Sequence, residues 1–210
     1  MLHGRSPFLG LEPVKLLADT LVTLSKRRPT YSCNQVPIHG AVYSPAAKKG
    51  GSMPVHELSD YRYRGARSLV LLHDAAMREL LPVWRRAKER GTPLPTTTDP
   101  AYGSLPALLH HVLRASRGYM TWLCEKLGLP DPGIEPAPEA DHVEAEAERY
   151  LEHLLERWRL PLAGVEEKRF ESIHKTRWGE DMSCESMLEH AVMHPHRHRF
   201  QLEELMEAQG

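Results

Sequence analysis

The chain has 210 residues, of which 41% are hydrophobic and 26% are charged, and its formal net charge is −1. This length provides for one domain with a substantial core, and the lack of an overall basic excess argues against a nucleic-acid-binding protein. Three cysteines are too few for a disulfide framework or a cysteine-based zinc motif. The sequence contains no apolar run of about 18 residues, the length that a membrane-spanning helix needs, and no clear secretion signal. We therefore expect a protein of the reducing cytoplasm that binds neither nucleic acid nor a membrane.

Residues 1–52 differ in character from the rest of the chain. They hold seven Lys or Arg and two Asp or Glu, a net charge of +5, which leaves −6 for residues 53–210. From Pro29 onward this region is rich in Pro, Gly and Ser and has no hydrophobic period. Two interpretations stay open: a flexible, poorly structured N-terminal extension, or upstream sequence outside the native protein, which would then start at Met53. Nucleic-acid binding by this basic stretch is a minor hypothesis, testable by electrophoretic shift with and without it.

Residues 53–210 contain four amphipathic segments in which apolar residues recur at three- and four-residue spacing. Ser104 is a predicted N-cap, and Gly91 is predicted to end the first helix. The segment 161–182 lacks a helical period, and its partial alternation predicts a short extended or hairpin piece. The predicted helices cover about 57–90, 104–128, 139–159 and 183–208. Because no series of strands accompanies them, the pattern predicts an all-α four-helix bundle.

The fourth helix carries histidines on its predicted buried face. On a helical wheel this face consists of Met187, Ala191, His194, His198, Gln201 and Leu205. His194 and His198 are four residues apart, a separation that lets two side chains on adjacent turns meet at one cation. His190 lies one turn earlier on nearly the same face, so the pair His190/His194 is a rival. His196 points the opposite way and is predicted to be solvated, whereas Gln201 is placed to reach the site.

The second helix supplies an independent signal. His111 lies between Leu108 and Ala115 on the apolar face, whereas its neighbour His110 is predicted to face solvent. His73, on the apolar face of the first helix, is a candidate fourth participant or hydrogen-bonding neighbour of the ligands. Inward-facing histidines on packed helices each need a polar partner, and one shared cation would satisfy them together. The alternative is that each is a hydrogen-bonded core residue without a metal.

Two motifs together resemble the DinB/YfiT-like superfamily. "HPHRHRFQLEEL" is similar to its C-terminal helix signature, and "LLHHVLRASRGYMTWL" is similar to its second-helix signature. The resemblance covers about residues 55–210 and implies an up-down-down-up four-helix bundle with a divalent metal held by His111, His194 and His198. It also implies homodimers and diverse reactions on small-molecule substrates. These include transfers that use a small thiol such as mycothiol, bacillithiol or glutathione, and hydrolase-like chemistry.

Three imidazole ligands leave a tetrahedral metal with one open position, where a water or a thiol is deprotonated. Zinc and nickel are the first expectations, with iron and manganese as alternatives, because histidine ligation alone does not select the metal. The leading hypothesis is a metal-dependent thiol transferase; the others are a metal-dependent hydrolase and a non-catalytic metal-binding helical bundle. Cys124 and Cys184 are predicted to be core or helix-end residues, and Glu189 is predicted to face outward.

Overall fold

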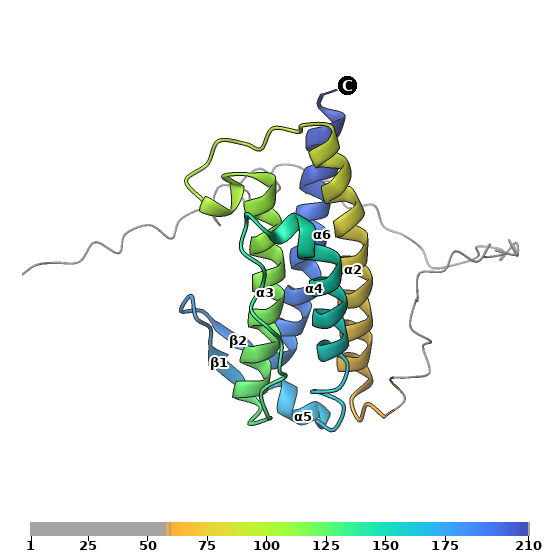
Figure 1. Ribbon diagram of the computed structural model, residues 1–210. Coiled ribbons are helices and arrows are strands. Elements are labelled where there is room, and N and C mark those ends of the chain that lie inside the picture. Colours follow the sequence, from red (N-terminus) through yellow and green to blue (C-terminus); the bar gives the residue numbers. More distant parts are fainter. Residues whose placement is uncertain (1–57, 59, 210) are drawn as a thin grey trace, which may run out of the picture. The chain divides into compact units, whose positions relative to one another are not determined.

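The computed structural model describes residue 58 and residues 60–209 (Figure 1). As predicted, this part of the chain is mostly helical and contains four long helices. They are α2 (Arg64–Glu89), α3 (Leu105–Lys126), α4 (Val143–Trp158) and α6 (Cys184–Glu207). The shorter elements are η2 (Pro100–Tyr102), α5 (Glu167–Phe170), β1 (Ile173–Lys175) and β2 (Asp181–Ser183). None of the helices among these residues has the length and apolar character needed to cross a membrane. The predictions for residues 1–52 lie outside the described residues.

Side-chain caps and glycine define several helix ends. The Ser104 hydroxyl accepts a hydrogen bond from the backbone N–H of Ala107 at 3.1 Å, which confirms the predicted start of α3. Ser183 caps α6 in the same way, through the backbone N–H of Ser186 at 3.0 Å. Gly91 follows α2 with φ of 62°, a left-handed conformation that favours glycine and turns the chain away from the helix.

Two helices begin later than the sequence pattern predicts. Before α2 starts at Arg64, the backbone N–H of Arg62 donates to the carbonyl of Ala163 at 2.9 Å, so the preceding segment bonds to a distant loop instead of extending the helix. Before α4 starts at Val143, the Glu139 carbonyl accepts from two successive N–H groups and forms a tight turn. Neither the long-range hydrogen bond of Arg62 nor the turn at Glu139 leaves a signature in the hydrophobic period.

The segment between α4 and α6 contains the predicted hairpin. Strands β1 and β2 pair antiparallel, with Ile173 opposite Ser183. The Trp122 indole N–H donates to the Lys175 carbonyl at 3.2 Å, which attaches the hairpin to α3. The single turn of α5, which buries Phe170 completely, was not predicted because four residues are too few to show a helical period.

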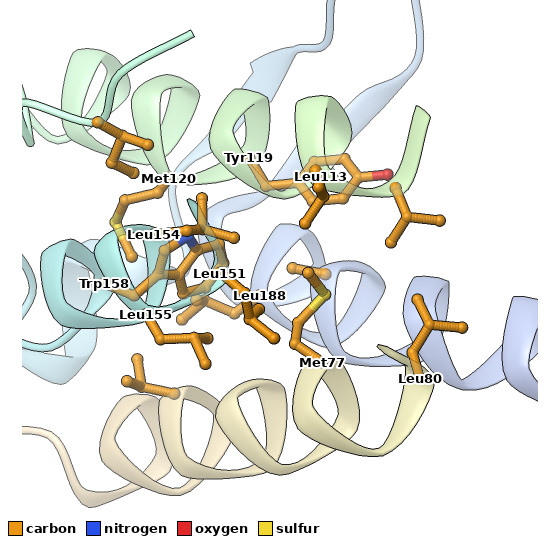
Figure 2. Close-up of a cluster of buried hydrophobic side chains, with 14 of the residues drawn as sticks. Met77, Leu80, Leu113, Tyr119, Met120, Leu151, Leu154, Leu155, Trp158 and Leu188 are labelled. Atoms are coloured by element: carbon orange, nitrogen blue, oxygen red, sulfur yellow. The ribbon is translucent and has the colours of Figure 1, made fainter. Parts of the chain in front are cut away.

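The long helices share one apolar core, which lies between them (Figure 2). Figure 2 labels core side chains from all four: Met77 and Leu80 of α2; Leu113, Tyr119 and Met120 of α3; Leu151, Leu154, Leu155 and Trp158 of α4; and Leu188 of α6. Burial of this apolar surface is the main stabilising contribution to such a structure. It also places the inward faces of α3 and α6 against each other.

The four long helices run in two opposite directions. Figure 1 shows α2 and α6 running in one direction and α3 and α4 in the other. The ion pair between Arg85, late in α2, and Glu148, early in α4, at 3.0 Å agrees with antiparallel packing of these two helices. Because α3 and α4 are parallel, residues 127–142 must run back along the molecule to connect them. This connection covers the part of α3 that contains His110.

Candidate metal centre

Helix α6 brings two of the predicted ligands into the interior. His194 and His198 are each 4% exposed and lie one turn apart on the face that packs against α3. The buried face then continues through Leu202 and Met206, whereas Leu205, which the wheel placed on it, is only half-buried.

The three predicted ligands meet in space. Nε2 of His111 lies 3.0 Å from Nε2 of His194, which in turn lies 3.3 Å from Nε2 of His198. One nitrogen from each of the three rings lies within 4.8 Å of the other two. Two donors on a tetrahedral zinc ion at about 2.0–2.1 Å from the metal are separated by about 3.3–3.4 Å. The two short separations are therefore close to those of ligands on one small cation, and all three nitrogens lie near enough together that the cluster could hold one.

Burial keeps these imidazoles neutral. Desolvation lowers the pKa of His198 to about 4 and the pKa of His194 well below its ordinary value. Half-buried His111 has its pKa lowered for the same reason. A neutral imidazole has one nitrogen lone pair, the form that binds a metal, so all three rings are able to act as ligands at neutral pH.

The surroundings of His198 determine which nitrogen faces the cluster. Its Nδ1 lies 3.5 Å from the hydroxyl of Tyr102, which donates to Oε1 of Gln201 at 2.8 Å. Because the Tyr102 proton is directed to Gln201, the hydroxyl oxygen can accept the Nδ1 proton of His198. The network thus favours the tautomer whose Nε2 lone pair points to the other two histidines. Gln201 takes the position beside the site that the wheel assigned to it.

A cation fits this donor set better than hydrogen bonding alone. Nδ1 of His194 is buried and has no hydrogen-bond partner among the described residues, so Nε2 provides the close polar contacts of this ring. A single Nε2 proton on His194 would have to be shared between His111 and His198. One divalent ion would instead accept all three lone pairs at once. The cluster could hold such an ion; with only neutral nitrogen donors it does not identify which one.

His73 lies elsewhere in the interior. It is 0% exposed, its Nε2 is 2.9 Å from the Ser116 hydroxyl, and its ring stacks on Trp158 with centroids 3.7 Å apart. These contacts, and not the three clustered histidines, account for its burial. The structure therefore does not bring His73 to the site as a fourth participant.

The other histidines have separate surroundings. His190 is not in the cluster: its ring lies 6.1 Å from that of His194 and near Tyr119, at 5.2 Å, and Trp178, at 5.8 Å. The expectation that His110 is solvated is wrong, because the ring is half-buried and its Nδ1 lies 2.7 Å from a carbonyl of the returning connection, that of Pro138.

His196, also predicted to be solvated, is half-buried and stacks on Phe200. The expectations for the cysteines and for Glu189 are confirmed. Cys124 and Cys184 are buried, with their pKa values raised mainly by desolvation, and Glu189 is exposed.

Sequence reasoning missed the residues that surround the ligands. Tyr102 lies in η2, before α3, where no helical period reaches; the only local signal is Asp99, whose side chain caps η2. Arg197, on α6, is exposed, and an exposed residue carries no pattern that distinguishes it from an ordinary surface position.

Comparison with known proteins finds no matching family model, no similar curated protein and no similar solved structure. The function must therefore be inferred from the site itself and from the motif resemblance. The homodimer that this resemblance implies stays a prediction.

Proposed function

We propose that His111, His194 and His198 hold one divalent metal ion with an open coordination position, and that the chain is a metal-dependent enzyme of the DinB/YfiT-like type. The convergence of three neutral imidazole nitrogens in a buried site carries this proposal. The order of helix directions, with α2 and α6 opposite to α3 and α4, supports the superfamily assignment, because it is the order that the resemblance implies.

The reaction we propose is the transfer of a small cellular thiol to an electrophilic substrate. A divalent ion at such a site supplies Lewis acidity, which favours the thiolate form of a bound thiol at neutral pH. The residues of the chain prepare the site for it. Burial keeps the ring of His194 in its neutral form, and Tyr102 with Gln201 holds the Nδ1 proton of His198, which leaves Nε2 free.

The two cysteines in the described part of the chain favour an external thiol as the reactant. Cys124 and Cys184 are buried, and burial raises the pKa of Cys124 to about 11, so neither is prepared to act as a nucleophile. A hydrolase, in which water takes the place of the thiol, and a non-catalytic metal-binding bundle are the outcomes against which the proposal is tested.

Metal binding is tested first. Protein purified without chelator should contain about one divalent ion per chain, measured by elemental analysis. His111→Ala should weaken zinc binding by more than the 10–100-fold that loss of a hydrogen-bonding neighbour of a ligand typically costs. His110→Ala is the matched control, because the adjacent ring contacts Pro138 instead of the cluster, and it should bind zinc like the wild type. Equal zinc affinity of both variants and the wild type would refute the site.

The reaction is tested on the metal-loaded protein. Incubation with an electrophile and mycothiol, bacillithiol or glutathione should yield a thiol conjugate that mass spectrometry detects, and His111→Ala should abolish its enzymatic formation. Metal binding without any conjugate over a range of electrophiles, together with metal-dependent hydrolysis of ester or amide substrates, would replace the transferase by the hydrolase. Metal binding with neither reaction would leave a metal-binding bundle.

A further inference from the structure

Arg197 lies on α6 beside the candidate metal centre. It follows His194 by three residues and precedes Gln201 by four, so it is close to both on the surface of the helix. Unlike His194 it is exposed, so its guanidinium is able to contact a molecule that approaches from solvent. Arg197 thus lies at the solvent-facing edge of the site.

The contacts of the Arg197 guanidinium differ from those of its neighbour Arg199. Among the described residues Arg197 forms no hydrogen bond or ion pair. Arg199, two residues further along the same helix, is engaged: it pairs with Glu79 at 3.0 Å and lies over the ring of Phe200 at 4.6 Å. The difference identifies Arg197 as a cation without a structural role in the described part of the chain.

The neighbours of Arg197 on α6 contact two other elements. Gln201 accepts a hydrogen bond from the hydroxyl of Tyr102 in η2 at 2.8 Å, and the ring of His194 lies 5.7 Å from that of Tyr119 in α3. Because Arg197 is adjacent to both Gln201 and His194 on the helix surface, it lies beside the place where the three elements meet.

The charge balance of the proposed site favours an anion. The three imidazole ligands are neutral, so they offset none of the two positive charges of a divalent ion. Asp99 is an acidic group whose charge reaches His111 and His198, and one of its oxygens is already bonded to the N–H of Ala101 at 2.9 Å. With Arg197 added, the loaded site keeps a positive excess at its solvent side.

We infer that the substrate of this site carries a carboxylate and that Arg197 binds it. The inference rests on the proposed function and names the chemical class of the thiol. A guanidinium binds a carboxylate through two parallel N–H···O hydrogen bonds, which give both affinity and orientation. Arg197 would hold the substrate so that its reacting group faces the three histidines.

The test uses the cobalt(II)-loaded protein and two thiols that differ in one group. The probes are 4-mercaptobutanoate, which has a carboxylate, and 4-mercaptobutan-1-ol, which has a hydroxyl in its place. The thiolate-to-cobalt absorption band reports binding of each, without any turnover. The wild type should bind the carboxylate probe at least about tenfold more tightly, as expected for one charge-assisted pair. In Arg197→Gln the ratio should fall to about three or less.

Two further variants make the result specific. Arg199→Gln removes an equal charge from the same helix but from a guanidinium that Glu79 already engages, and it should keep the wild-type ratio. Arg197→Lys keeps the charge but loses the planar fork, and should keep an intermediate ratio. Circular dichroism and the melting temperature verify that each variant is folded, as expected for exposed Arg197.

The two possible failures are distinguishable. If cobalt does not bind to the wild type, the proposed metal site is refuted, and the inference about Arg197 is refuted with it. If cobalt and both thiols bind but the wild type shows no preference, or Arg197→Gln keeps the full preference, the carboxylate inference alone is overturned.

Discussion

Replacement of Tyr102 by Phe tests how the protein prepares His198 as a ligand. The substitution removes one hydroxyl, which lies 3.5 Å from Nδ1 of His198 and donates to Gln201 at 2.8 Å. Without it, the Nδ1 proton loses an acceptor, and the tautomer with a free Nε2 lone pair is less favoured. The aromatic ring stays, so the packing around η2 should change little.

The expected loss of zinc affinity is about tenfold, or about 1.4 kcal/mol. This loss is at the lower end of the roughly 10–100-fold range that is usual for a residue hydrogen-bonded to a ligand, because the contact of Tyr102 with His198 is long and Gln201 also hydrogen-bonds His198. Competition with a chromophoric chelator at pH 7 measures the affinity. Tyr150→Phe is the matched control, since its hydroxyl donates to the Glu135 carbonyl at 2.9 Å, away from the three histidines. Wild-type affinity in Tyr102→Phe, or equal losses in both variants, would refute the reasoning.

Three further predictions concern the fold. Burial lowers the pKa of His73 to about 3, so the unfolded state, with a pKa near 6.5, binds the proton more readily. The contribution of His73 to the free energy of unfolding should therefore be constant above about pH 6.5. Below that pH it should fall by up to about 1.4 kcal/mol per pH unit. Urea unfolding at pH 7, 6 and 5 gives the free energy of unfolding at each pH. This free energy should depend less steeply on pH in His73→Gln than in the wild type, and an equal dependence on pH would contradict the prediction. Gly91→Ala should lower stability by about 1 kcal/mol because φ is 62° there, whereas Gly118→Ala within α3 should raise it by about 0.5–1 kcal/mol; denaturant midpoints that move the opposite way would disagree. Because Cys124 and Cys184 are buried, at most one of the three thiols should react with Ellman's reagent before denaturant is added, and two or more would count against their burial.

The helical pattern predicted the three clustered histidines because it reports the direction in which a side chain points. On an α-helix the apolar period identifies the buried face, and a histidine on that face must point inward. His194 and His198 were selected in this way on α6, and His111 on α3, and the structure brings their nitrogens together.

The same pattern failed where neighbours matter more than direction. His73 does point inward, yet it lies beside Ser116 instead of His111. A helical wheel gives the direction of a side chain but not which residues of a neighbouring helix lie at the same position along the axis. His110 points away from the apolar face, but the irregular connection that returns to α4 covers it through Pro138. Tyr102 lies next to His198 because the short turn before α3 folds back toward α6. Contacts made by irregular segments depend on tertiary structure, which a periodicity does not encode.

The most direct test of the metal centre is a crystal structure of zinc-loaded protein with an anomalous difference map at the zinc edge. We expect one strong peak at about 2.0–2.1 Å from Nε2 of His111, His194 and His198, with a non-protein ligand at a fourth position. A map without a peak among these rings, or with the zinc bound by other residues while the three nitrogens stay in mutual hydrogen bonds, would contradict it.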